Sequence, residues 1–339
     1  MADEQMALET SINDFFQRSG LTSRDRLECY IFIEKLYPGR PISPASCQGY
    51  CSMTVFVGDD TVIQFRPHSY RLDLRITEAA RQVYGIFAPE TTYLATLPES
   101  GLAVYGMGRI EGISFNHFRA SEALIAGSSY CRMELCKDFA AFLAKSWHAN
   151  RLEELPLGQV GKSLVTRLKS LSTDLPPRFQ PAVRNVLRNL NRIEGLPWVL
   201  THGDIVTANI MVHPSTGRLT GLVDWAEAER LPFGTCLYGL EEVLGEMTVA
   251  GFQYYGDAEE LRALFWVELQ RHVLDLEQKP VLDVVKLARE LGILLWHGIA
   301  FDNGAIDRVV QEGRDIEEMQ RLDAFLLGDY SGAERVSKI

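Results

Sequence analysis

Apolar residues recur at helical spacing through the first part of the chain. Leu8, Ile12 and Phe16 form one such series, and a second series continues to Leu36. Spacings of three and four residues place side chains on one face of a helix. The pattern therefore predicts helices across residues 1–37.

The pattern then changes to short runs typical of strands. Residues 51–57 and 61–66 are such runs, and a turn-forming Gly-Asp-Asp lies between them, which predicts a β-hairpin. A helix is expected across 74–86 and a further strand across 102–105. This part of the chain is expected to be small and rich in β-structure.

Helical spacing returns near residue 120 and dominates the rest of the chain. The expected helices span 131–150, 164–190, 238–247 and 316–327, the second of them interrupted by a Leu-Pro-Pro stretch. One hairpin interrupts this region. It comprises a strand across 210–213, a Pro-Ser-Thr-Gly turn and a return strand across 218–223. The pattern as a whole predicts an α+β fold.

Polar residues lie at the open end of that second hairpin. Asn209 precedes its first strand, Asp224 follows its second strand, and Asp204 lies on the loop before it. Adjacent strands are about 4.8 Å apart, so Asn209 and Asp224 are expected to reach one cation. Their amide and carboxylate oxygens are hard ligands suited to magnesium. The sequence therefore predicts a magnesium site there, with Asp204 beside it.

The stretch 200–234 reads LTHGDIVTANIMVHPSTGRLTGLVDWAEAERLPFG, with Asn209 five residues after Asp204. This order resembles the catalytic loop of kinases, H-x-D-x-x-x-x-N followed by a metal-binding Asp. Gly203 before the first Asp and Trp225 after Asp224 are similar to the aminoglycoside phosphotransferase and choline kinase-like family. The amino-acid sequences of residues 219–225 and 294–298 resemble the fungal-type branch of that family, which suggests a role in secondary metabolism.

The resemblance implies a bilobal protein-kinase-like fold. We expect an N-terminal helical segment at 1–40, a β-rich N-lobe at 41–108 and a helical C-lobe at 109–339, which contains the catalytic loop at 200–234. It implies a phosphotransferase that uses ATP and Mg²⁺ to phosphorylate a hydroxyl of a small molecule.

The resemblance also assigns roles within the loop. Asp204 would position the substrate hydroxyl and accept its proton, and Asn209 and Asp224 would bind magnesium. Asn209 thereby also belongs to the expected cofactor-binding residues. His202 would order the loop through hydrogen bonds, and a direct role as an acid is the second interpretation.

The main departure from the family lies in the strand at 61–66. The family places a phosphate-binding Lys there, paired with a Glu on the next helix. Glu78 suits the Glu, but Gln64 occupies the Lys position and lacks its charge. Arg66 has the same strand parity as Gln64 and is expected on the same face. It is a candidate substitute, as are Arg71 and Arg75; the alternative for Arg66 is an ordinary exposed strand end.

The resemblance further places adenine against the backbone of Tyr105 to Met107, in a hinge between the lobes, although a plain connecting loop remains the alternative. The loop 46–50 would cover the phosphates, but its one glycine is equally compatible with a simple turn. Gly161-Lys162-Ser163 is similar to the end of a phosphate loop, but Pro156 stands where that motif requires Gly.

Composition narrows the functional classes. The formal net charge of −11 argues against a nucleic-acid partner, which requires basic patches. The acidic N-terminal stretch lacks a signal-peptide pattern, apolar runs are too short for a membrane span, and the six scattered cysteines suit reduced thiols. These features predict a cytoplasmic protein, and the family resemblance implies a small-molecule partner.

Two alternatives remain open from the sequence. Gln64 is compatible with a kinase-like scaffold that performs no phosphotransfer, either a metabolite-binding protein or a repurposed biosynthetic enzyme. Separately, Glu241, Glu242 and Glu246, together with later aromatic residues, would suit a cationic ligand. The simpler interpretation of those residues is a helical core with acidic outer faces.

Overall fold

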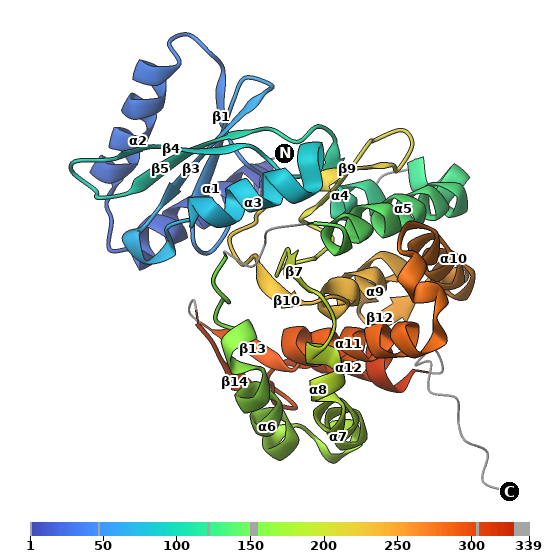
Figure 1. Cartoon of the computed structure of the whole chain (residues 1–339). Coiled ribbons are helices and arrows are strands. Elements are labelled where there is room, and N and C mark those ends of the chain that lie inside the picture. Colours follow the sequence, from blue (N-terminus) through green and yellow to red (C-terminus); the bar gives the residue numbers. More distant parts are fainter. Residues whose placement is uncertain (1, 47, 121–122, 150–154, 303–304, 329–339) are drawn as a thin grey trace, which may run out of the picture. The chain divides into compact units, whose positions relative to one another are not determined.

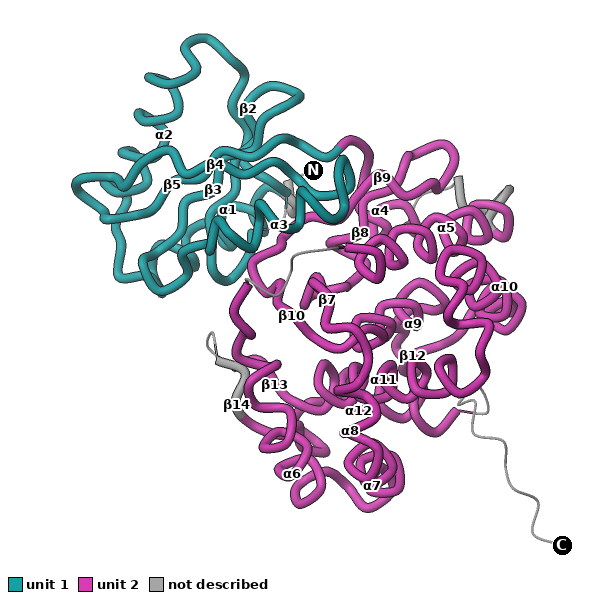
Figure 2. The backbone as a smooth tube through the Cα atoms, in the orientation of Figure 1, with its two compact units in different colours: residues 1–110 teal, residues 111–339 magenta. Residues whose placement is uncertain are grey.

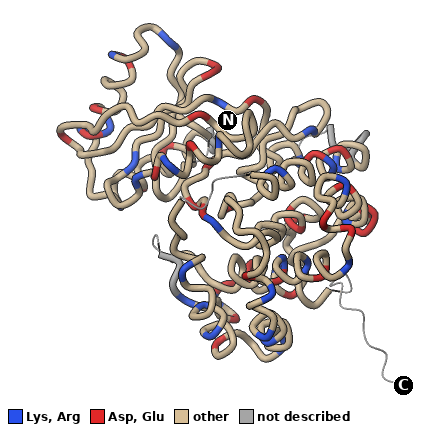
Figure 3. Tube along the Cα trace, in the orientation of Figure 1, with Lys and Arg blue, Asp and Glu red and all other residues tan. Residues whose placement is uncertain are grey.

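The computed structural model describes residues 2–46, 48–120, 123–149, 155–302 and 305–328. The chain divides into two compact units, residues 1–110 and residues 111–339 (Figure 2). Basic and acidic residues are spread along the backbone trace of both units (Figure 3).

Unit 1 is built on a five-stranded antiparallel sheet with strand order β1-β2-β3-β5-β4 (Figure 1). Its elements in chain order are α1 (Ala2–Arg18), α2 (Ser23–Leu36), β1 (Ile42–Pro44), β2 (Met53–Val57), β3 (Thr61–Arg66), α3 (Leu74–Tyr84), β4 (Thr91–Thr96) and β5 (Ala103–Gly108). The predicted N-terminal helices, the β2–β3 hairpin, the following helix and the later strand are all confirmed.

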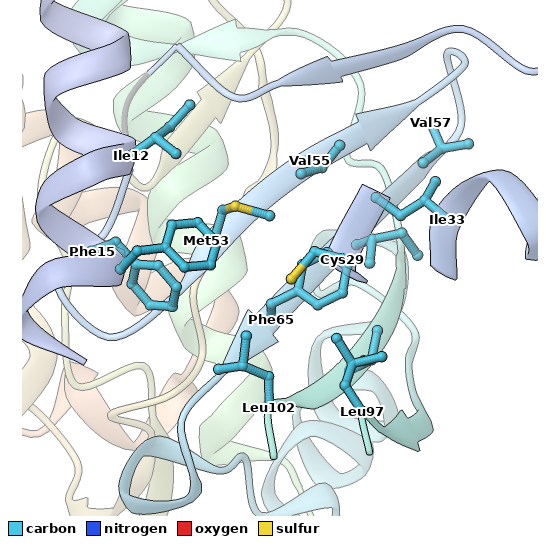
Figure 4. Close-up of a cluster of buried hydrophobic side chains, with 13 residues drawn as sticks. Ile12, Phe15, Cys29, Ile33, Met53, Val55, Val57, Phe65, Leu97 and Leu102 are labelled. Carbon is cyan, nitrogen blue, oxygen red and sulfur yellow. The ribbon is translucent and has the colours of Figure 1, made fainter. Parts of the chain in front are cut away.

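Helices α1 and α2 pack on one face of this sheet. The strand residues on that face alternate with residues of the other face, as the pleat requires. The resulting core is wholly apolar (Figure 4) and comprises Ile12, Phe15, Phe16, Cys29, Ile33, Met53, Val55, Val57, Ile63, Phe65, Leu97, Leu102 and Val104. Burial of these side chains, each contributing about 1.5–3 kcal/mol for a Val, Leu, Ile, Phe or Met, holds the two helices to the sheet.

The other face of the sheet carries the residues expected to bind a nucleotide. Gln64 pairs across the sheet with Thr54 on β2 and with Tyr105 on β5. Arg66 and Met107 each lie two residues farther along their strands and therefore share that face. The prediction that Gln64 and Arg66 point the same way is confirmed.

Unit 2 contains most of the helices. They are α4 (Phe115–Arg119), α5 (Ala123–Trp147), α6 (Leu164–Asp174), α7 (Gln180–Arg188), α8 (Leu190–Glu194), α9 (Gly239–Leu244), α10 (Ala258–His272), α11 (Lys279–His297) and α12 (Ile316–Leu322). The long helices expected around 131–150 and 164–190 are confirmed, the second divided by the Leu-Pro-Pro stretch. Helix α12 continues into a π-helical turn, Asp323–Leu327.

Short sheets complete unit 2. Their strands are β6 (Ile113–Ser114), β7 (Trp198–Thr201), β8 (Ile210–Val212), β9 (Leu219–Leu222), β10 (Glu229–Pro232), β11 (Gly245–Thr248), β12 (Gly251–Tyr254), β13 (Ile299–Asp302) and β14 (Ala305–Val309). They form a three-stranded sheet β6-β8-β9 and the pairs β10-β7, β11-β12 and β13-β14. The predicted hairpin at 210–223 corresponds to β8 and β9, so it is confirmed.

The helix predicted across 238–247 is wrong at its C-terminal end. Helix α9 stops at Leu244, and Gly245 adopts an extended backbone that starts the hairpin β11–β12. A Cβ on Gly245 would lie 2.5 Å from the carbonyl oxygen of Gln253, so only glycine permits this close strand pairing. Glu246 therefore lies on a strand and not on the helix that carries Glu241.

No helix within the described ranges has the length and apolar character needed to cross a membrane.

Candidate active site

The candidate catalytic loop begins where strand β7 ends. β7 pairs with β10, and Thr201, its last residue, lies opposite Glu229. The Thr201 hydroxyl also donates to the carbonyl oxygen of Glu229 at 2.9 Å. The start of the loop is therefore fixed to β10, the strand that follows the β8–β9 hairpin.

Gly203 is required by the geometry of this loop. Its φ is +78°, in the region that favours glycine, and a Cβ there would lie 2.0 Å from the carbonyl oxygen of Glu227. The glycine thus allows the backbone before Asp204 to approach the backbone just after Asp224.

Asn209 and Asp204 contact each other directly. The Asn209 side-chain nitrogen donates to Oδ2 of Asp204 at 2.8 Å and to its carbonyl oxygen at 3.0 Å. The amide oxygen of Asn209 is left as the atom able to serve as a metal ligand, since the nitrogen is turned toward Asp204.

Asp224 lies at the open end of the hairpin, as its spacing predicts. The amide of Val223 donates to the carbonyl oxygen of Asn209 at 3.0 Å, which places Asp224 one residue beyond the last paired position. Asp224 has φ = 60°, and among the described residues no other non-glycine residue has a positive φ. Such a conformation costs free energy and is frequent at functional sites.

His202 connects the backbones on both sides of the site. Its Nε2 donates to the carbonyl oxygen of Val223 at 2.9 Å, and its Nδ1 accepts from the amide of Asp204 at 3.2 Å. Burial lowers its pKa to about 4, so the ring is neutral near pH 7. This arrangement suits the predicted ordering role better than the alternative role as an acid.

The Asp204 carboxyl is perturbed by its surroundings. Burial and then the negative charge of Asp224 raise its pKa to about 7, while the hydrogen bond from Asn209 acts in the opposite direction. Two carboxylates close enough to repel each other provide a place where a cation would be stabilised. The donor set of Asn209 and Asp224, hard oxygens at one end of a hairpin, fits magnesium.

The sequence did not single out Tyr238 as a support of the loop. Its hydroxyl accepts from the amide of Ile205 at 2.8 Å, directly after Asp204. The Tyr238 ring stacks on Trp296 with a centroid distance of 5.2 Å. Gly239 lies so close that a Cβ would be 2.3 Å from the Ile205 side chain. No local pattern indicates such a contact, because the partners are more than thirty residues apart.

Trp225, the residue after Asp224, has a structural role. Its Nε1 donates to the carbonyl oxygen of Leu222 at 2.9 Å, and its ring lies 4.6 Å from that of His202. Buried between the hairpin and the loop, it holds the chain on both sides of Asp224 in place.

The contacts of Glu241 and Glu242 favour the simpler interpretation, a helical core, over the alternative of a cationic-ligand site. Glu241 is fully buried and is paired with Arg262 at 2.7 Å and with Arg289 at 2.8 Å. Glu242 is paired with Arg321 at 3.0 Å. Buried carboxylates require such partners, so these two residues are already neutralised within the helical core.

In unit 1, the side chains of Gln64 and Arg66 are buried and hydrogen-bonded to each other. Nε of Arg66 donates to Oε1 of Gln64 at 3.0 Å, and Nε2 of Gln64 donates to the hydroxyl of Thr54 at 3.3 Å. Arg66 is thus a buried residue, contrary to the exposed strand end that the sequence left open. Glu78 is exposed and accepts from Gln82 at 3.3 Å, one helical turn along α3.

Tyr105 and Met107 lie inside β5 and not beyond its end. Each is paired with β3 on one side and β4 on the other, so the sheet uses their backbone groups. The Tyr105 hydroxyl accepts from the amide of Leu72 at 3.1 Å. Their assignment to adenine binding stays a prediction.

The loop before β2 is held at two points. The side chain of Gln48 bonds the amide and the carbonyl of Thr54 at 2.7 and 3.0 Å, which ties the loop to the strand. From α1, Arg18 donates to the carbonyl oxygens of Gly49 and Tyr50, both at 3.0 Å. Cys47, which belongs to the loop predicted to cover phosphates, lies outside the described residues.

Comparison with known proteins identifies the family. A model of the phosphotransferase enzyme family (APH) matches residues 49–234, more than half of the chain and the whole catalytic loop. The chain belongs to this family. A curated relative, the uncharacterized protein YcbJ of Bacillus subtilis (strain 168), is 29% identical over 89 residues, and this match spans 26% of the chain and 28% of that relative.

Two solved structures of aminoglycoside phosphotransferases are similar in fold to this chain. The GDP and kanamycin complex of APH(2")-IIia matches with a TM-score of 0.55 over 80% of this chain and 91% of that chain, at 13% identity. The GDP complex of a mutant aminoglycoside 2'-phosphotransferase-IIIa matches with a TM-score of 0.52 over 80% and 89%, also at 13% identity. The predicted α+β, kinase-like fold, with an N-terminal antiparallel sheet and a helical C-terminal region, is confirmed.

Proposed function

We propose that this protein is a magnesium- and ATP-dependent phosphotransferase that acts on a hydroxyl group of a small molecule. The observation that carries the proposal is the grouping of Asp204, Asn209 and Asp224 at one loop and hairpin end. Family membership supports the same reaction class.

Each residue of the group has a role in this proposal. Asp204 orients the acceptor hydroxyl and takes its proton as the hydroxyl oxygen attacks the terminal phosphate. Asn209 fixes the carboxylate of Asp204 through its amide nitrogen. His202 is a positioning residue that keeps the backbones of Asp204 and Val223 in register.

The cofactor assignment follows from the same donors. Asn209 and Asp224 would hold Mg²⁺ through their side-chain oxygens. The chemistry that bound magnesium supplies is neutralisation of the charge on the phosphate groups. Asp224 offers its carboxyl oxygens for this purpose from a backbone held in an unusual conformation.

The proposed acceptor is a small molecule that carries a hydroxyl group. Kanamycin is bound by one structural relative, at 13% identity, and that similarity extends only to the fold. We retain the assignment to a fungal-type branch and to secondary metabolism as a proposal that rests on residues 294–298 and 219–225.

The test is formation of a phosphorylated product from ATP. Purified protein with Mg²⁺ and ATP is incubated with panels of aminoglycosides, sugars, amino alcohols and hydroxylated secondary metabolites, and products are detected by mass spectrometry. Asp204→Asn is expected to lower kcat by about 100- to 10,000-fold, because it removes the base. The matched control is Asp174→Asn, at an exposed position at the end of α6, which is expected to keep full activity.

Full activity in Asp204→Asn would contradict the proposed chemistry. If neither ATP nor any member of the panel is consumed while an organic metabolite binds, the result favours the non-phosphorylating scaffold that Gln64 suggests.

A further inference from the structure

We propose that Arg66 supplies the positive charge for nucleotide phosphates in this protein, and that Gln64 is the positioning residue that fixes its guanidinium. The inference rests on the proposed function and deepens it. Gln64 cannot provide the charge of the Lys that it replaces. In this proposal it acts through Arg66, two residues farther along the same strand.

Gln64 is occupied at both ends of its amide. Its oxygen accepts from Nε of Arg66 at 3.0 Å, and its nitrogen donates to Oγ1 of Thr54 at 3.3 Å. The neutral amide of Gln64 therefore connects Thr54 on β2 to the guanidinium of Arg66. A Lys at this position would have no acceptor to offer the guanidinium.

Arg66 is oriented by the groups that Gln64 and the following turn present. Nε bonds to Gln64, and Nη1 donates to the carbonyl oxygen of Tyr70 at 3.4 Å. A guanidinium is planar, so hydrogen bonds at two of its nitrogen atoms, together with the side chain that carries it, restrict the orientation of the whole group. An oriented guanidinium is suited to bidentate contact with phosphate oxygens.

The position of Arg66 also suits this role. It shares with Tyr105 and Met107 the face of the sheet opposite to the apolar core of α1 and α2. Arg66 lies two residues beyond Gln64 on β3. Its side chain therefore leaves the sheet on the same face as Gln64, which occupies the position of the family's Lys.

The other two candidate cations are placed differently. Arg75 is paired with Asp73 at 2.6 Å, and its side chain is 68% exposed. Arg71 is exposed and donates to the hydroxyl of Thr96 at 3.1 Å. Among the three arginines named from the sequence, Arg66 is the one that is both buried and bonded to Gln64.

A polar chain links Arg66 to the loop that is expected to cover the phosphates. Gln64 contacts the hydroxyl of Thr54, and the backbone of Thr54 is bonded at both polar groups by the side chain of Gln48. Gln48 also donates to the carbonyl oxygen of Ala45 at 2.9 Å. The loop and the guanidinium are thus positioned by one continuous set of side chains.

The experiment measures how binding depends on the number of phosphates. Adenosine, AMP, ADP and ATP, each with Mg²⁺, are titrated by calorimetry into wild-type protein and into Arg66→Met, Arg66→Lys, Arg71→Met and Arg75→Met. Arg66→Met is expected to weaken ATP binding about tenfold to a hundredfold, the value of a charge-assisted contact, and to leave adenosine binding unchanged. Arg66→Lys is expected to recover part of the ATP affinity.

Arg71→Met and Arg75→Met are the matched controls, because they remove the same charge from the same unit. They are expected to bind all four ligands like the wild type. A loss that affects adenosine and ATP equally in Arg66→Met would indicate a structural defect and would overturn the inference. Adenosine binding also serves as the check that each variant is folded.

A second variant tests the role of Gln64. Gln64→Met keeps the length of the side chain but removes the acceptor, so ATP affinity should fall while adenosine affinity is retained. In the Gln64→Met background, the further change Arg66→Met should cost less than it does in the wild type, because the two residues act as one unit. Additive losses would overturn the positioning role.

The failure of the inference is distinguishable from failure of the proposed function. If wild-type protein binds ATP and Arg66→Met binds it equally well, the inference fails and the proposed function stands. If wild-type protein binds none of the phosphorylated ligands, both fail together.

Discussion

The side-chain nitrogen of Asn209 lies 2.8 Å from a carboxylate oxygen of Asp204. The residue expected to bind magnesium therefore also holds the residue expected to act as the base. This contact joins the two halves of the proposed chemistry, because a movement of Asn209 would displace both a metal ligand and the Asp204 carboxylate.

Replacement of Asn209 tests that coupling. Asn209→Ala removes both the amide oxygen and the donor to Asp204, so we expect phosphotransfer activity to fall about tenfold to a hundredfold, with a higher Mg²⁺ requirement. The measurement is kcat and the half-saturating Mg²⁺ concentration. Asn191→Ala, at an exposed position on α8, is the control and should match the wild type. Equal Mg²⁺ requirements for Asn209→Ala and the wild type would contradict the assignment.

Gly203→Ala tests the close approach of the loop to the backbone near Asp224. The new Cβ would lie 2.0 Å from the carbonyl oxygen of Glu227, at a φ of +78°. The left-handed backbone alone costs a non-glycine residue about 1–2 kcal/mol, and the steric conflict adds to this. We expect a lower free energy of unfolding in urea and a strong loss of activity. Gly256→Ala is the matched control, since its Cβ would meet nothing within 4 Å; equal stability of the two variants would speak against the described loop.

The lowered pKa of His202 is expected to reduce the free energy of unfolding in mild acid. Burial lowers its pKa from 6.5 to about 4, so between these values the unfolded chain binds a proton that the folded protein does not. The stability contribution is complete above pH 6.5 and is lost as the pH falls toward 4, by roughly 3 kcal/mol.

Urea unfolding between pH 7 and pH 4.5 measures this effect. The raised pKa of Asp204 contributes a slope of the opposite sign in each of these proteins, so the test is the difference between them: the slope of unfolding free energy against pH should be less positive in His202→Asn, which has no titrating ring. His213→Asn, at an exposed position after β8, should keep the wild-type slope. The comparison uses slopes and not absolute stabilities, because His202→Asn also loses two hydrogen bonds. Identical slopes in all three proteins would exclude a buried neutral His202.

The sequence was sufficient for features set by local chemistry. The spacing of Asp204, Asn209 and Asp224 around a Pro-Ser-Thr-Gly turn predicted the hairpin β8–β9 and the position of Asp224 at its open end. Strand parity was enough to place Gln64 and Arg66 on one face. These features follow from the period of the strand and from turn residues, which act over a few positions.

Contacts between distant segments were beyond the reach of the sequence pattern. The hydroxyl of Tyr238 supports the amide of Ile205, and the bond between Gln64 and Arg66 depends on side-chain conformations within the packed sheet. The end of helix α9 at Leu244 was also missed, because the pairing of Gly245 with β12 decides it. In each case tertiary packing selects one of several local alternatives.

Gly161-Lys162-Ser163 shows why a motif fragment requires its structural context. The amides of Val160 and Gly161 do bind an anionic group, but it is the buried carboxylate of Glu229, at 3.0 and 2.8 Å. Burial raises the pKa of Glu229, and these two backbone donors act against that shift. In this turn, where Pro156 replaces the glycine that the motif requires, the two amides serve an internal carboxylate.

The most direct test of the central claim is thermal unfolding of wild-type protein and Asp224→Ala with Mg²⁺ alone, ATP alone and both together. A ligand that binds the native state raises the midpoint by mass action. The account predicts an increase in Tm that requires both ATP and Mg²⁺ and disappears in Asp224→Ala. No change in the wild-type Tm at millimolar Mg²⁺ and ATP, or an equal increase in Asp224→Ala, would contradict it.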